Sequence, residues 1–153
     1  MERKLFKFAH VNIVARDWRK LSAFYEQVFG CERVPPERDL EGEAIDHLTG
    51  LPQARIRGIH LRLPGCGADG PTLEIFQYNI SEARPGTAIH RPGFAHIAFK
   101  VDDVDEIRSA VLSAGGGAIG KTVALEIKDG GHLTAVYLTD PEGNIIECQR
   151  WED

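Results

Sequence analysis

The sequence contains one pattern twice, and this repeat limits the possible folds more than any other feature. Each copy starts with the letters FAH, at Phe8 and again at Phe94, and continues as an apolar, strand-like stretch that ends in aspartate. A segment with apolar residues at helical spacing follows each copy, and strand-like stretches come after it. The chain is therefore predicted to hold two modules of the same order: strand, helix, strand, strand, strand.

The two predicted helices have recognisable ends. Asp17 is an N-cap candidate for the first helix, and Gly30 is placed to end it. Asp102 and Asp103 cap the second helix, which is expected to end at the glycines that begin with Gly115. The letters EAIDHLTGLP predict one further short helix, within a segment of the first module that has no copy in the second.

The remaining strands are predicted from alternating apolar residues between turn-forming letters. They span residues 32–34, 56–63 and 72–78 in the first module, and 122–127, 133–139 and 145–151 in the second. The turns before the last strand of each module are GCGADGP and DPEGN, both rich in residues that tolerate tight backbone conformations.

A helix covers only one face of a four-stranded sheet, so the other face of each module needs a partner. Two modules that face each other meet this need and leave a cleft. The predicted fold class is α+β, with two tandem βαβββ modules forming an open, barrel-like mixed sheet around that cleft. We expect a single domain over 1–153, with module 1 at about 5–78, a connector at about 79–93 and module 2 at about 94–151.

Charge and hydropathy narrow the class of partner. The 153 residues carry a formal net charge of −5, which argues against binding to nucleic acid or to an anionic membrane surface. No segment approaches the roughly 18 apolar residues of a membrane span, and the first residues lack the apolar run of a signal peptide. We therefore expect a cytoplasmic protein with a small-molecule partner, and we assign its three cysteines no role.

Strand parity places one histidine and one glutamate of each module on the same predicted face. Side chains alternate between the two faces of a strand, so the apolar residues of the FAH strands point away from His10 and His96. The same count on the last strand of each module sets Glu74 and Glu147 opposite their apolar neighbours. All four side chains are expected to face the cleft.

These four side chains predict a metal site. One histidine or one glutamate in a strand is usually structural or solvated, but here both recur at equivalent places within apolar stretches. Two imidazoles and two carboxylates suit one divalent ion such as Ni, Co, Zn, Mn or Fe. His60, Arg62 and Tyr137 have the parity to enter the same cleft, and we expect them to contact substrate.

Four stretches resemble a known family. FAHVNIVARDWRKLSAFYEQVFG, LEIFQY, GFAHIAFKVDDVDEI and YLTDPEGNIIECQ are similar to the glyoxalase/bleomycin-resistance/dioxygenase group, also called the vicinal oxygen chelate superfamily. The resemblance implies paired βαβββ modules around one metal ion. It also matches His10, Glu74, His96 and Glu147 to the four-ligand arrangement of glyoxalase I. Methylmalonyl-CoA epimerase is similar, but it usually has Gln where Glu74 stands.

The expected function is that of a metal-dependent isomerase, epimerase or lyase. A metal-held carbonyl favours loss of a proton from the neighbouring carbon, with Glu147 as the base and Glu74 as its partner on the opposite face. The resemblance leaves alternatives: a metal-free protein that binds a small ligand or an antibiotic, an extradiol-type iron dioxygenase, or a fosfomycin-type transferase with two histidines and one glutamate. Glutathione adducts, acyl-CoA thioesters and cyclitol or sugar ketones all remain possible substrates. We also expect a homodimer.

Overall fold

The structure is a computed structural model that describes residues 5–153. It divides into two compact units, one ending at Glu82 and the other beginning at Ala83. The boundary between the units lies within the predicted connector. Each unit has its own sheet and is described separately, and the single domain stays a prediction.

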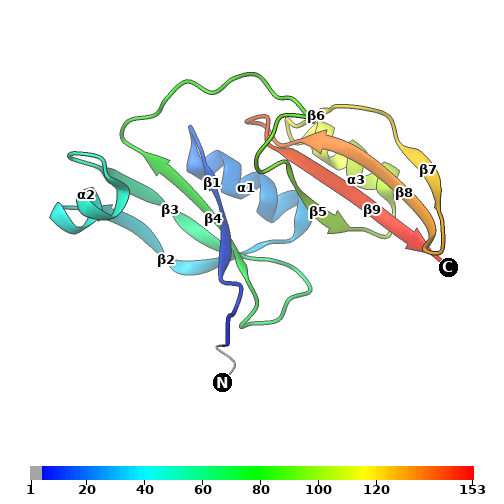
Figure 1. The fold of residues 1–153 in the computed structure, drawn as a ribbon, viewed down its shortest axis with the longest axis horizontal. Coiled ribbons are helices and arrows are strands. Elements are labelled where there is room, and N and C mark those ends of the chain that lie inside the picture. The colour runs from blue at the N-terminus through cyan, green and yellow to red at the C-terminus, as the bar shows by residue number, and fades with distance from the viewer. Residues whose placement is uncertain (1–4) are drawn as a thin grey trace. The chain divides into compact units, whose positions relative to one another are not determined.

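The first unit is a four-stranded mixed sheet with one long helix against it (Figure 1). The strands are ordered β1-β4-β3-β2, with β1 parallel to β4 and the other neighbours antiparallel. Its elements are β1 (His10–Val14), α1 (Trp18–Phe29), β2 (Glu32–Glu41), α2 (Glu43–Thr49), β3 (Arg55–Arg62) and β4 (Thr72–Tyr78).

Helix α1 begins and ends where its capping residues predict. The Asp17 carboxylate accepts a hydrogen bond from the Lys20 backbone N–H at 3.1 Å, and Gly30 takes the left-handed conformation (φ 67°) that closes the helix. The helix packs against β3 and β4, burying Leu21 and Tyr25 completely. The predicted short helix is also confirmed as α2, which ends at Gly50.

Strand β2 is longer than predicted, because its ladder resumes after an interruption. Its register with β3 shifts between Val34 and Arg38, where Pro35 and Pro36 lie. Proline has no N–H to donate, so it is tolerated where a ladder is broken. It also interrupts the alternating pattern from which a strand is predicted. Pairing then continues from Arg38 to Glu41.

The second unit repeats the arrangement with one further strand. It consists of β5 (His96–Lys100), α3 (Val104–Ser113), β6 (Gly117–Ala118), β7 (Val123–Ile127), β8 (Gly131–Thr139) and β9 (Ile145–Glu152). The order is β5-β9-β8-β6, with β5 parallel to β9, while β7 also pairs with β8. Asp103 caps α3 by accepting from the Glu106 backbone N–H at 2.9 Å.

The two-residue strand β6 was not predicted, and the helix ends slightly earlier than the glycine run. Ala114 caps α3, and the chain then passes close to β8. A Cβ on Gly116 would lie 2.4 Å from the Thr139 carbonyl oxygen, so only glycine allows this approach. The glycines therefore bring the chain onto the sheet as well as ending the helix.

The DPEGN turn before β9 is organised by one buried carboxylate. Asp140 is 2% exposed, and its Oδ1 accepts from the backbone N–H groups of Glu142 (2.9 Å) and Asn144 (3.0 Å). Its Oδ2 accepts from the Asn144 side chain at 2.8 Å. Thr87 of the connector donates to the Gly143 carbonyl at 2.8 Å, so the turn is tied to the chain that leads into β5.

The helix-facing side of each sheet holds the core. Leu73 and Ile75 of β4, and Ile146 and Cys148 of β9, are all fully buried, as the parity argument predicts. Among the described residues there are three helices and two mixed sheets, neither of which closes into a barrel. The α+β fold class is confirmed, whereas the cleft between the modules stays a prediction.

Candidate functional site

In the first unit, the sheet register brings Glu74 between two polar side chains. Glu74 lies opposite Asn12 of β1 and opposite His60 of β3. His10 lies two residues before Asn12, so it shares their face. The neighbours Leu73 and Ile75 point into the core. Strand alternation therefore presents one polar row on the face opposite α1.

The Glu74 carboxylate is almost buried and well bonded. It is 8% exposed; Oε1 accepts from Asn12 Nδ2 at 2.8 Å, and Oε2 lies 2.7 Å from His60 Nε2. His10 Nε2 is 3.6 Å from Oε1, and the rings of His10 and His60 meet edge to face with centroids 5.7 Å apart. These contacts offset the cost of burying a carboxylate.

His60 is held as a neutral imidazole. Burial lowers its pKa; Glu74 partly opposes this effect, and Arg38 and His10 add to it. Its Nδ1 is 3.0 Å from the Thr72 hydroxyl. A proton on Nε2 satisfies both contacts, because Nε2 then donates to Glu74 while Nδ1 accepts from Thr72.

Phe76 closes one side of this group of residues. Its ring lies 6.0 Å from that of His60. A Cβ on Gly58 would meet the Phe76 ring at 2.7 Å and the Ile75 carbonyl oxygen at 2.0 Å. Glycine at this position in β3 is therefore what lets the aromatic ring lie over the strand beside His60.

The second unit builds the corresponding pair with fewer polar contacts. His96 Nε2 lies 3.0 Å from Glu147 Oε2. Glu147 is opposite Ala98 of β5 and Tyr137 of β8, and the Tyr137 ring packs on His96 with centroids 5.2 Å apart. The register relations match those of the first unit, with Ala98 in the place of Asn12 and Tyr137 in that of His60.

The roles of two residues in the polar row of His10, Asn12, His60 and Glu74 were not predicted from the sequence. His60, expected to contact substrate, is the closest partner of Glu74. Asn12 was not singled out, although it has the parity of His10 and is a polar residue in an apolar strand. Arg62 lies on the same face, bonds Glu32 at 3.2 Å, and has a buried Nε for which the described residues supply no hydrogen-bond acceptor.

The spacing within each His–Glu pair fits two ligands of one ion. Ligand atoms about 2.1 Å from a metal, at right or tetrahedral angles, lie about 3.0–3.4 Å apart. The pairs His10–Glu74 (3.6 Å) and His96–Glu147 (3.0 Å) are close to this range. Within residues 5–153, no group of three or more His, Cys, Asp or Glu side chains is arranged to hold an ion. The metal and its four ligands stay a prediction.

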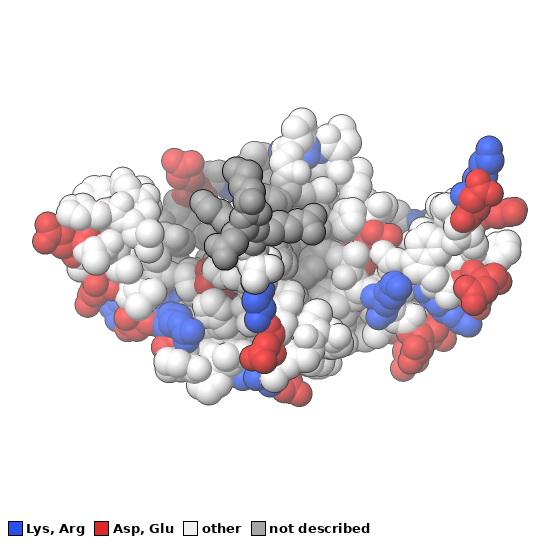
Figure 2. Space-filling view, turned by 60° about the horizontal axis from the view of Figure 1, so that its bottom comes forward, with Lys and Arg blue, Asp and Glu red and all other residues white. Residues whose placement is uncertain are grey.

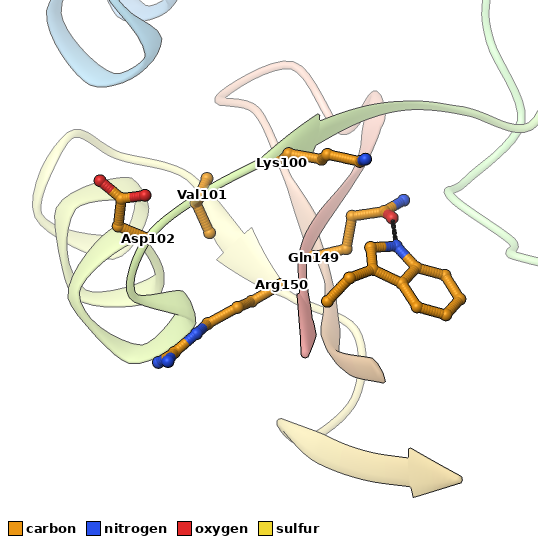
Figure 3. A pocket seen from close by; sticks show the side chains of 6 residues that line it. Lys100, Val101, Asp102, Gln149 and Arg150 are labelled. Atoms are coloured by element: carbon orange, nitrogen blue, oxygen red, sulfur yellow. Dashed lines mark hydrogen bonds between the residues drawn. The ribbon is translucent and has the colours of Figure 1, made fainter. Parts of the chain in front are cut away.

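The second unit also has an open pocket at the ends of β5 and β9 (Figure 3). It is lined by Lys100, Val101, Asp102, Gln149, Arg150 and Trp151. In this view Lys100 and Gln149 point to one side of the strand pair, and Asp102 and Arg150 to the other.

The surface charge gives no sign of a polyanion-binding face. On the side drawn in Figure 2, basic and acidic side chains of the described residues are interspersed, with no extended basic patch. In the part of the chain that is described, no helix has both the length and the apolar content to span a membrane.

The chain matches a family model over almost its whole length. The model described as Glyoxalase/Bleomycin resistance protein/Dioxygenase superfamily covers residues 7–148. None of the curated proteins matches the chain.

Solved structures share the fold at low sequence identity. A glyoxalase family protein from Bacillus cereus has a TM-score of 0.83 at 21% identity, covering 99% of this chain and 98% of its own. A glyoxalase/bleomycin resistance protein/dioxygenase family enzyme from Burkholderia phytofirmans has a TM-score of 0.60 at 20% identity, with 96% and 100% covered. The fosfomycin resistance protein FosX from Listeria monocytogenes, in complex with Mn(II) and sulfate, has a TM-score of 0.54 at 14% identity, with 97% and 95% covered. At these identities the likeness shows the fold alone.

Proposed function

The chain belongs to the glyoxalase/bleomycin resistance protein/dioxygenase superfamily, and on that premise we propose that it is a divalent-metal-dependent isomerase, epimerase or lyase. The reaction is a proton transfer next to a carbonyl group of a small substrate. The observation that carries the proposal is the matched His–Glu pair on the same face of both sheets, at equivalent register positions.

The proposed ligands are His10, Glu74, His96 and Glu147. Each unit supplies one imidazole nitrogen and one carboxylate at a spacing that suits a common ion. Protein metal sites use three or more side chains, so neither pair is sufficient alone. The proposal therefore requires both pairs at one ion, contributed either by one chain or by two chains that exchange halves.

A bound divalent ion supplies a Lewis acid that polarises the carbonyl of the substrate. The protein must then remove a proton from the neighbouring carbon, and we assign this role to Glu147. The Glu147 carboxylate contacts one histidine, His96, through Oε2. In Glu74 both carboxylate oxygens are bonded, Oε1 to Asn12 and Oε2 to His60. Glu147 is thus the less restrained carboxylate, and Glu74 serves the opposite face if both faces react.

The remaining predicted contacts keep their roles within the proposal. Tyr137 is 38% exposed beside His96, so its hydroxyl group is available to orient substrate. Arg62 presents a guanidinium two residues from His60 on the same face, where it suits an acidic group of the substrate. His60 holds Glu74 in place and contacts substrate from the first unit.

Metal content and solvent-deuterium exchange together test the function. Protein purified without chelator, or reloaded with Ni, Co, Zn or Mn, should bind one ion per pair of half-sites, and it should exchange substrate protons with deuterated water. The Glu147→Gln variant should keep most of the metal and lose about two to four orders of magnitude in exchange rate, the usual value of a positioned base. His96→Ala should lose both metal and exchange.

The matched control is His132→Ala. His132 is exposed on the opposite face of β8 from Tyr137, so its removal should change neither metal content nor rate. The assignment would be overturned if none of the four ions binds, or if Glu147→Gln shows full exchange with metal bound.

One observation favours a second candidate. Both Glu74 oxygens already accept hydrogen bonds, which leaves His10, His96 and Glu147 as a set of two histidines and one glutamate. This is the set that resembles fosfomycin-type enzymes. Retention of metal and inactivation of fosfomycin by a Glu74→Gln variant would favour this candidate, whereas loss of the metal favours the four-ligand site.

A further inference from the structure

We propose that the pocket at the ends of β5 and β9 binds an anionic group, a carboxylate or a phosphate, at the far end of the substrate. The inference rests on the proposed function, because it takes the reacting carbonyl to lie at Glu147. It adds a substrate class to that function: elongated organic acids.

Part of the pocket lining, Lys100, Gln149 and Trp151, lies on the same face as the His96–Glu147 pair. Lys100 follows His96 by four residues on β5, and Gln149 follows Glu147 by two on β9, so parity places all four on one face. Lys100 and Gln149 are also opposite each other in the ladder. At about 3.3 Å per residue, Gln149 lies about 7 Å from Glu147 along the strand, and Lys100 lies about 13 Å from His96.

Lys100 is the positive charge available to a ligand on this side. Arg150, the other cation of the lining, bonds Glu152 at 2.5 Å, and in Figure 3 it points away from Lys100, as Asp102 does. Among the described residues, no acidic side chain forms an ion pair with the exposed Lys100. Its ammonium group has three donors and no acceptor, so it favours an anion.

Gln149 and Trp151 complete an arrangement that offers donors. The Trp151 indole N–H donates to Gln149 Oε1, so the amide oxygen is engaged and the amide NH₂ group remains to donate. Trp151 is 40% exposed, and its indole offers an apolar surface for the carbon skeleton of the ligand. Two donors beside an aromatic ring suit an acid with an organic body better than an uncharged ketone.

These positions set the length of the substrate. Lys100 pairs with Gln149 and Ala98 pairs with Glu147, so both lining residues lie two residues beyond Glu147. An acid bound at Lys100 and Gln149, with its reacting carbon at Glu147, carries its charge about 7 Å along the strands from the carbon that loses the proton. A small neutral aldehyde or ketone reaches the glutamate without filling the pocket.

Binding of phenyl phosphate in the presence of EDTA tests the inference without any metal. The readout is the indole N–H resonance of Trp151 in a ¹⁵N–¹H spectrum, distinguished from that of Trp18 by a Trp18→Phe variant. We expect saturable shifts with phenyl phosphate and none with benzyl alcohol. Benzoate and inorganic phosphate then separate carboxylate binding from phosphate binding.

The variants isolate the charge of the lysine. Lys100→Met should weaken phenyl phosphate binding about threefold to tenfold, the loss expected for a charge-assisted hydrogen bond at a partly exposed site. Lys100→Arg should restore it. The matched control Lys121→Met removes an exposed lysine outside the pocket and should leave binding unchanged. Unchanged binding in Lys100→Met, or no saturable shift with any of the three anions up to about 50 mM, overturns the inference. Failure of the metal and exchange experiments alone leaves this result intact and overturns only the proposed function.

Discussion

Replacing Asp140 should test how strongly one carboxylate supports the second unit. In Asp140→Ala, the backbone N–H groups of Glu142 and Asn144 and the Asn144 side chain lose their acceptor. Hydrogen bonds to a charged acceptor contribute about 1.5–3 kcal/mol each, and bonds that share one carboxylate do not add fully. Water reaches the partly exposed turn and recovers some of the loss. We expect the free energy of unfolding to fall by about 3 kcal/mol.

The Asp140→Asn variant separates geometry from charge. Both backbone N–H groups donate to Oδ1, and an asparagine oxygen can accept from both at the same position. The contact of Oδ2 with the Asn144 amide is lost, because two NH₂ groups then face each other. The expected cost is about 1–2 kcal/mol, clearly below that of alanine.

Urea unfolding followed by tryptophan fluorescence and by far-ultraviolet circular dichroism measures both changes. Trp151 lies in the unit that contains the turn, and Trp18 lies in the other. Asp69→Ala, at an exposed position in a turn of the first unit, is the control and should stay within about 0.5 kcal/mol of wild type. The reasoning is refuted if Asp140→Ala is equally mild, or if asparagine costs as much as alanine.

Three further predictions concern the thiols, the pH dependence of stability and the assembly. Burial, reinforced by Glu26, raises the pKa of Cys31 to about 11, and burial together with Glu147 raises the pKa of Cys148 to about 12. An Ellman titration of native protein at pH 8 should therefore count only the exposed Cys66. After denaturation the same titration should count all three thiols. Thiols of the unfolded chain ionise from about pH 9, whereas Cys31 and Cys148 in the folded protein do not. The stability that comes from burying these two neutral thiols is therefore complete below pH 9 and is lost as the pH rises towards 11–12. Unfolding midpoints that do not fall across that window contradict the burial argument. We also expect a homodimer, and a monomer mass in light scattering at micromolar concentration contradicts this.

Local signals were sufficient for most of the fold. Asp17 and Gly30 defined α1 because a cap and a left-handed glycine act within one turn of the helix. Strand alternation placed Glu74 and Glu147 opposite buried neighbours, because one buried face fixes the register. The second part of β2 was missed because Pro35 and Pro36 interrupt its pattern, and pairing resumes only through contacts with β3.

The polar row could be predicted only in part, because it depends on which strands become neighbours. Parity placed His60 on the correct face, but the sequence does not show that β3 runs beside β4 in the register that sets His60 against Glu74. Asn12 was missed for the same reason, since it gains its role from the parallel pairing of β1 with β4. Contacts between residues 62 positions apart leave no local pattern.

The parallel pairing of β1 with β4 has a consequence for how the chain can fold as it is synthesised. The first strand of this unit to leave the ribosome pairs with the last strand of the same unit, through contacts such as His10 with Thr72. Until Thr72–Tyr78 has emerged, β1 has no neighbour, although the antiparallel pair β2–β3 can already form. Strand β4 ends at Tyr78 and β5 begins only at His96, so the first sheet has all its strands before any strand of the second is made. Each half can therefore fold in turn, N-terminal half first, without borrowing a strand from the other.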